Sequence, residues 1–147
     1  MSITANSGKF VQLSHLSNAQ IFVADPVPFS RRLIGDLFSD GKCGRVDFFD
    51  NGASLIEACS SSCPDIIIID DRLPFIFGVE LLRTMSNLPS FHEKSPIFVL
   101  LAEDTTKSAV EEAISGGFAF VIKKPFVPSY LMQIVRQIIL DQVSVAS

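Results

Sequence analysis

Four consecutive isoleucines at positions 66–69 are the feature of this chain that most restricts its fold. Successive side chains of a strand point to opposite faces of a sheet, so an unbroken apolar run is buried on both faces. A strand of this kind belongs to the middle of a parallel sheet that helices cover on each side. The run leads into Asp70 and Asp71, and Pro74 follows. The sequence therefore predicts a buried strand that carries negative charge at its carboxyl end.

Four more apolar runs and five segments with helical spacing extend this pattern along the chain. The predicted strands lie within 19–25, 44–49, 65–70, 95–102 and 117–122. The predicted helices lie within 28–39, 53–60, 78–86, 105–115 and 128–141, where apolar residues recur every three or four positions. Five alternations of strand and helix are typical of a three-layer α/β domain with a parallel sheet. We expect one domain over residues 19–141, a flexible tail over 1–18 and a short tail over 142–147.

Composition argues against several classes of function. The net charge of −4 gives no overall attraction to nucleic acids or anionic membranes, so we expect no direct nucleic-acid binding and no membrane association. No apolar run approaches the roughly 20 residues of a membrane span. The cysteines Cys43, Cys59 and Cys63 lack a CxxC spacing and have no nearby histidine. We therefore expect reduced thiols in a cytoplasmic protein and no zinc site.

Charged residues cluster where the predicted strands end. Ligands of open parallel sheets bind beyond the carboxyl ends of the strands, and here those ends carry Asp25, Asp70 and the pair Lys123–Lys124. Carboxylates on separate strands suit Mg²⁺, which takes one or two of them in proteins and keeps several waters. A lysine opposite them would pair with an anion, and an aspartate so placed can attack a phosphoryl group.

Three motifs together resemble a known family. They are "IFVAD" at 21–25, "IIIIDDRLP" at 66–74 and "KKPF" at 123–126, and in this order and spacing they resemble the receiver domain of two-component response regulators. The resemblance implies a (βα)5 flavodoxin-like fold with a doubly wound, parallel, five-stranded sheet. It implies a single-domain receiver in phosphorelay signalling, which is a signalling module and not an enzyme.

The resemblance also assigns roles to the matching residues. Asp70 would be the phosphoacceptor, because the family places that residue four positions before a proline, here Pro74. Asp25, Asp70 and the backbone carbonyl of Arg72 would bind Mg²⁺. Lys124, directly before a proline, matches the lysine of the family's site, whereas its neighbour Lys123 should point elsewhere.

Partners follow from the same resemblance. A histidine kinase or a phosphotransfer protein would supply the phosphoryl group. A downstream protein target would read the aspartyl phosphate, because we see no output domain after the last predicted helix. Receivers commonly dimerise or bind partners through the face formed by the fourth helix, fifth strand and fifth helix of their fold, so this chain could form a homodimer there.

Three positions depart from the family pattern. Pro26 stands where the family has a second acid that binds the metal directly, so we expect weak Mg²⁺ binding. Leu101 replaces a serine or threonine that bonds the phosphoryl group. Val121 aligns with the family's switching aromatic residue, while Phe120 would face the other side of the sheet. A phosphorylation-independent pseudo-receiver that binds partners is therefore the alternative function.

Other residues near the predicted site leave two interpretations open. Asp71, Glu103 and Asp104 are either solvated loop acids and caps or substitutes for the missing acid. The apolar residues 75–77 form either a partner-binding surface or a lid packed on the core. A flavodoxin-like enzyme or nucleotide binder is a more distant possibility, since no glycine-rich phosphate loop follows the first strand.

Overall fold

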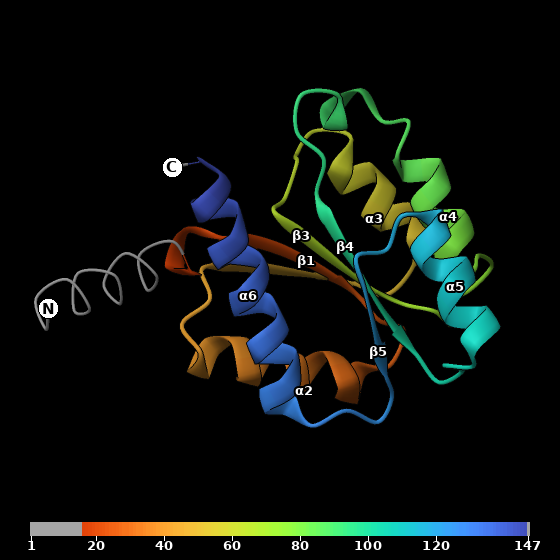
Figure 1. Cartoon of the computed structure of the whole chain (residues 1–147), viewed down its shortest axis with the longest axis horizontal. Coiled ribbons are helices and arrows are strands. Elements are labelled where there is room, and N and C mark those ends of the chain that lie inside the picture. The colour runs from red at the N-terminus through yellow and green to blue at the C-terminus, as the bar shows by residue number, and fades with distance from the viewer. Residues whose placement is uncertain (1–15, 147) are drawn as a thin grey trace, which may run out of the picture.

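The computed structural model describes residues 16–146 and contains one five-stranded parallel sheet (Figure 1). The strands are β1 (Gln20–Ala24), β2 (Arg45–Phe49), β3 (Ile66–Asp70), β4 (Ile97–Ala102) and β5 (Phe120–Lys123). The helices are α2 (Pro28–Asp40), α3 (Gly52–Cys59), α4 (Gly78–Met85), α5 (Lys107–Gly116) and α6 (Pro128–Ala146), with a short 3-10 helix η1 at Pro89–Phe91. The strand order β2-β1-β3-β4-β5 is that of a flavodoxin-like doubly wound sheet. The predicted fold class is confirmed.

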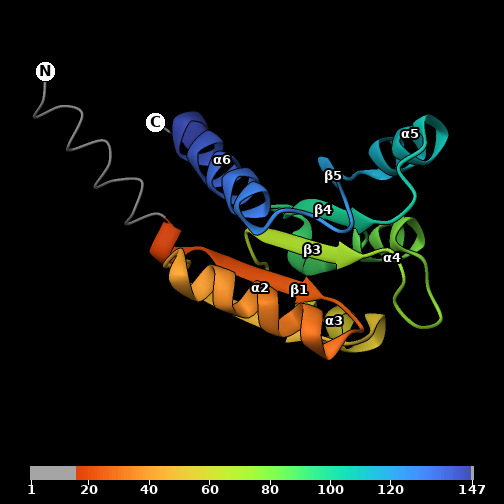
Figure 2. The same cartoon turned by 90° about the horizontal axis from the view of Figure 1, so that it is seen from below.

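The isoleucines of β3 hold the three layers together. Ile66 and Ile68 pack into the cluster that α2 and α6 cover, and Ile67 and Ile69 pack into the opposite cluster under α3, α4 and α5. All four are fully buried, and each such side chain contributes about 1.5–3 kcal/mol by its removal from water. Figures 1 and 2 show the helices divided between the two faces in this way.

Local signals fix where several helices begin and end. The side chain of Asn51 accepts a hydrogen bond from the N–H of Ser54 (2.8 Å) and caps α3, and Thr106 caps α5 by accepting from the N–H of Ala109 (3.3 Å). Gly117 ends α5 with φ at +119°, a left-handed conformation that a residue without Cβ adopts without strain. Asn51 and Thr106 therefore lie in strand–helix loops at the carboxyl edge of the sheet, and Gly117 lies in the helix–strand connection at the opposite edge.

The structure corrects both predicted tails. Residues 16–18 are helical, Leu16 is buried in the cluster beneath α2 and α6, and its carbonyl accepts from the N–H of Gly44 (3.0 Å). An apolar side chain beside the start of β1 is thus part of the core. Residues 1–15 of the predicted tail lie outside the described residues. At the other end α6 continues through Ala146, because no proline or glycine interrupts 142–146.

Two findings bear on the expectations from composition. Among residues 16–146, no helix combines the length and apolar character needed to cross a membrane. Cys43, Cys59 and Cys63 are free thiols, the first two of them buried.

The buried thiols should be unreactive in the native protein. Burial raises the pKa of Cys43 to about 11 and that of Cys59 to about 12, from an ordinary 9.0. The thiolate is the form that reacts with iodoacetamide. At pH 9, the reagent should therefore leave Cys43 and Cys59 of the native protein unmodified over a time in which it fully alkylates the urea-unfolded chain. The unfolded chain loses these protons at lower pH than the native one, so native stability should fall as pH rises above about 9. Peptide mass spectrometry measures the modification, and rapid native alkylation of Cys59 would contradict this account.

Candidate functional site

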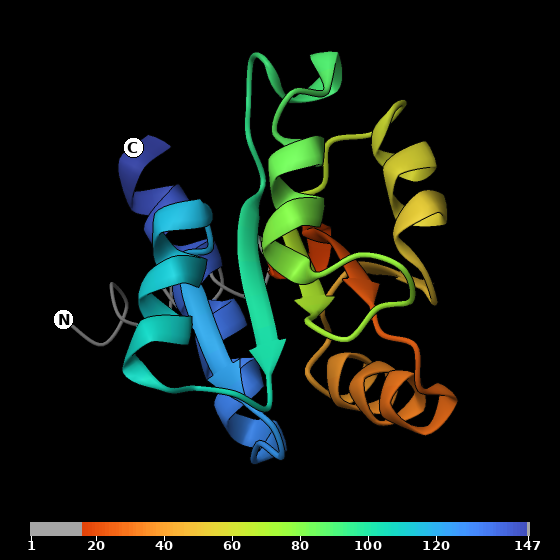
Figure 3. The ribbon, with the colours of Figure 1, turned by 90° about the vertical axis from the view of Figure 1, so that its right-hand side faces the viewer.

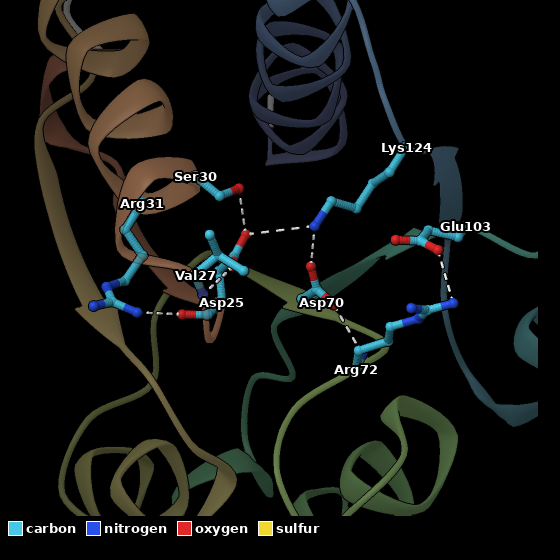
Figure 4. A network of polar contacts seen from close by, with 8 residues as sticks. All are labelled: Asp25, Val27, Ser30, Arg31, Asp70, Arg72, Glu103 and Lys124. Carbon is cyan, nitrogen blue, oxygen red and sulfur yellow. Dashed lines mark hydrogen bonds and ion pairs between the residues drawn. The ribbon is translucent and has the colours of Figure 1, made fainter.

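Three charged side chains from different strands meet at the carboxyl edge of the sheet (Figure 4). Asp25 follows β1 and Asp70 ends β3, the two strands that are neighbours where the chain order reverses. Lys124 follows β5, where its backbone N–H donates to the carbonyl of Ala102 on β4 (2.9 Å). Its side chain crosses the end of β4 to reach the acids. The predicted site residues are therefore brought together.

The lysine ammonium links the two acids. Lys124 Nζ forms an ion pair and hydrogen bond with Asp70 Oδ2 and lies 3.8 Å from Asp25 Oδ2. Asp25 is fully buried and Asp70 is 3% exposed. Buried carboxylates are costly unless they are paired and hydrogen-bonded, so one cation stabilises both. Lys123 is exposed, as expected for a residue that points away from the site.

Hydrogen bonds from the following loops fix both carboxylates. Asp25 Oδ1 accepts from the N–H of Val27 (2.9 Å), and its Oδ2 accepts from the hydroxyl of Ser30 (2.6 Å). Asp70 Oδ1 accepts from the N–H of Arg72 (2.8 Å). Every carboxylate oxygen of the pair therefore has a partner within the protein.

Two residues beyond the predicted metal and phosphoacceptor set also build the site. Ser30 donates to the carboxylate of Asp25, and Arg31 Nη1 donates to the backbone carbonyl of the same residue (2.7 Å). Both lie in the first turn of α2, directly after the strand end. That position was the available signal, since the first turn of a helix after a site strand faces the site.

The three additional acids have partners elsewhere. Asp71 Oδ1 accepts from the N–H that begins α4 (3.1 Å), and Asp104 Oδ1 accepts from the N–H of Thr106 (3.0 Å). Glu103 forms an ion pair with the side chain of Arg72 at 2.7 Å, with both side chains more than half exposed. These contacts favour the interpretation of the three as caps and surface acids, and none of the contacts includes Asp25, Asp70 or Lys124.

The donor set fits a Mg²⁺ ion. Within residues 16–146, no cluster of three or more histidine, cysteine, aspartate or glutamate side chains is arranged to hold a metal. Asp25 and Asp70 nevertheless supply two carboxylates, and each carboxylate oxygen has lone pairs beyond the hydrogen bond that it accepts. Mg²⁺ in proteins often has only one or two carboxylate ligands and several waters. The residues that could hold it are Asp25, Asp70 and the carbonyl of Arg72, which stays a prediction.

Comparison with known proteins identifies the family. A family model of the response regulator receiver domain matches residues 21–136. The chain belongs to this family. The receiver is 32% identical over 78 residues to the DNA-binding transcriptional regulator NtrC of Escherichia coli K12, a match that covers 53% of this chain and 16% of that protein. It spans between 16% and 37% of the length of the first curated relatives that it matches.

Solved receiver structures have the same fold. The chemotaxis response regulator CheY4 of Vibrio cholerae superposes with a TM-score of 0.74 at 19% identity, covering 82% of this chain and 98% of that one. The receiver domain of the sensor histidine kinase PA1611 from Pseudomonas aeruginosa PAO1 gives a TM-score of 0.71 at 20% identity, covering 82% and 97%. That neighbour has a magnesium ion coordinated in its active site cleft. At these identities the likeness shows the fold alone.

The receiver lacks a polar group at the end of β4. Leu101 pairs with Asp70 in the sheet register and is fully buried in the cluster beneath α2 and α6. On β5, Val121 packs on the side of α3, α4 and α5, whereas Phe120 packs on the opposite side. The expected difference in side-chain direction between residues 120 and 121 is confirmed. Leu101 and Val121 therefore supply neither the hydroxyl nor the aromatic ring that the family has at these two positions.

Of the apolar residues 75–77, one packs on the core and two are exposed. Ile76 packs against the cluster beneath α3, α4 and α5. Phe77 is 69% exposed, and Phe75 is 106% exposed with a left-handed φ of +70°. Left-handed backbone costs a residue with a side chain about 1–2 kcal/mol, and the ring of Phe75 gains no burial to offset this cost.

Replacing Phe75 by glycine should therefore stabilise the receiver. Phe75→Gly removes the steric strain and no packing, so the free energy of unfolding should rise by about 1 kcal/mol. Urea denaturation followed by circular dichroism would measure the midpoint. Phe77→Gly is the matched control, because φ at Phe77 is −78° and glycine gains nothing there. A lower midpoint for Phe75→Gly would show that the loop conformation is not strained.

Proposed function

We propose that this receiver accepts a phosphoryl group on Asp70 in two-component phosphorelay signalling and signals through protein–protein contacts. The convergence of Asp25, Asp70 and Lys124 at one buried point carries the proposal. Such a site offers a nucleophilic carboxylate, a second acid for a metal and a cation for the transferred group. The surroundings would be the cytoplasm, with no direct role for nucleic acid or membrane.

The chemistry at Asp70 would be a nucleophilic displacement. One carboxylate oxygen forms a bond to phosphorus while the bond from phosphorus to the donor's imidazole nitrogen breaks, and the imidazole takes a proton from water. Lys124, already in contact with Asp70, would pair with the phosphoryl oxygens. Mg²⁺ held by Asp25, Asp70 and the carbonyl of Arg72 would add positive charge when bound. Because Pro26 supplies no second acid, we propose that the ion binds weakly.

A histidine kinase or phosphotransfer protein would dock beside the mouth of the site. An apolar groove of about 240 Å³ lies there, between the first turns of α2 and the loop from β5 to α6, with Lys124 among its lining residues. Phe29 and Leu33 line it and are 68% and 50% exposed. Any protein that delivers a phosphoryl group to Asp70 must cover this edge. The face formed by α5, β5 and α6 remains for a second copy of the chain.

A phosphorylation-independent pseudo-receiver is the second candidate. Each carboxylate oxygen of Asp25 and Asp70 already has a partner within the protein. Leu101 and Val121 supply neither a hydroxyl nor an aromatic ring to report the phosphoryl group. The three charged residues would then form a fixed structural cluster, and partner binding would be constitutive.

Beryllofluoride, a mimic of the aspartyl phosphate, would distinguish the two candidates. With millimolar Mg²⁺, it should shift the backbone amide resonances at the ends of β1, β3 and β5 in the wild-type protein. The Asp70→Asn variant should show no such shifts, because the amide cannot form the complex. If the wild-type protein also fails to respond, the phosphoacceptor role is wrong and the pseudo-receiver stands.

The docking groove makes a separate prediction. Phe29→Ser should slow phosphoryl transfer from a phosphorylated histidine phosphotransfer protein by about tenfold, since a buried aromatic contact contributes over 1 kcal/mol to an interface. Transfer from acetyl phosphate, which needs no docking surface, should change by less than about twofold. Ile114→Ser on α5 is the control, because Ile114 is 48% exposed and does not line the groove. Equal slowing of both donors would mean that Phe29 supports the site itself.

A further inference from the structure

A second pocket lies on the other side of the sheet, between α4, α5 and the ends of β4 and β5. Its floor is apolar and includes Leu100, Ala102 and Val121. The small side chain of Val121 leaves this space open, whereas an aromatic ring at that position would extend into it. The volume of the pocket is about 210 Å³, below the roughly 300–1,000 Å³ typical of small-molecule sites. A pocket of this size suits a single amino-acid side chain.

An exposed phenylalanine lies at this pocket. Phe77 lines the pocket and is largely exposed, whereas the loop that precedes it runs from the end of β3 on the α3 side of α4, away from α5 (Figure 3). Exposed aromatic groups beside a concave site are typical of protein interfaces, where they contribute much of the binding energy.

The charges around the pocket define the side chain that it would accept. Asp71, Asp104 and Glu112 line it, and none of its lining residues is lysine, arginine or histidine. The hydrogen bonds that Asp104 accepts from Thr106 lower the pKa of its carboxyl group, which keeps it charged at neutral pH. A cation can pair with these carboxylates and also lie against the ring of Phe77. A guanidinium group does both better than an ammonium group, because it is planar and has five donors.

We propose that this pocket binds an arginine side chain from a basic segment of a partner protein, with the ring of Phe77 lying against that segment. The inference rests on and deepens the proposed function, because it gives the chemistry of the downstream target. Asp70 and Asp71 are consecutive, so the phosphoacceptor site and the pocket share one strand end. Binding in the pocket does not itself require the phosphoryl group.

Peptide titration would test the pocket directly. The probes are a short peptide with one arginine between leucines and the same peptide with citrulline, which has the same shape and no charge. Followed by backbone amide resonances and without Mg²⁺ or phosphoryl donor, the arginine peptide should shift Ala109, Glu112 and Val121. It should bind at least about fivefold more tightly than the citrulline peptide. Equal binding of the two peptides, or shifts confined to other surfaces, would overturn the proposal.

Variants of neighbouring residues provide the control. Glu112→Gln should weaken binding of the arginine peptide about fivefold, and Glu111→Gln should leave it unchanged, because Glu111 is exposed on the same helix and does not line the pocket. Val121→Phe should fill the pocket and abolish binding. Equal effects of the two glutamate variants would contradict the assignment. Failure of the arginine peptide leaves the role of Asp70 intact, and failure of beryllofluoride leaves the pocket intact.

Discussion

The contact of one lysine ammonium with two buried carboxylates is the interaction on which the site depends. The side chains of Asp25 and Asp70 are almost completely buried. Both lie next to Lys124, and without this cation their two negative charges would repel each other. The lysine is anchored by its backbone to β4, so its position depends on the correct pairing of β5. The site therefore forms only when β1, β3, β4 and β5 have paired. Its geometry is a result of the fold, and at the same time the ion pairs stabilise the ends of three strands.

The hydrophobic pattern made most of the fold predictable. The isoleucines of β3 are buried on both sides, as an unbroken apolar run requires. The end of this run predicted the position of Asp70 at the carboxyl end of the strand. The ends of α2, α3, α4 and α5 were predictable within two residues because caps and glycines act locally. Leu16 was missed because a single apolar residue in a polar stretch has no period. Its side chain packs in the cluster beneath α2 and α6, whose members are distant in sequence.

The chemistry of the site was predictable in kind but not in detail. Residues at strand ends converge in any sheet of this order, so Asp25, Asp70 and Lys124 could be grouped from the sequence. The family match supports the receiver assignment for residues 21–136. The hydrogen bond from Ser30 to Asp25 depends on the rotamer of the serine side chain. The left-handed backbone of Phe75 depends on the path of the loop between β3 and α4. Neither is encoded in a local pattern of residue types.

The alternation of side chains at the end of β3 has a mechanical consequence. Asp70 and Asp71 are joined by one peptide unit, which is planar and stiff. Asp70 contacts Lys124, whereas Asp71 accepts from the first N–H of α4. A shift of the backbone at the end of β3 would therefore displace both the carboxylate in the site and the carboxylate that holds the start of α4. Such a shared strand end could connect the site with a helix where the usual hydroxyl and aromatic groups are missing.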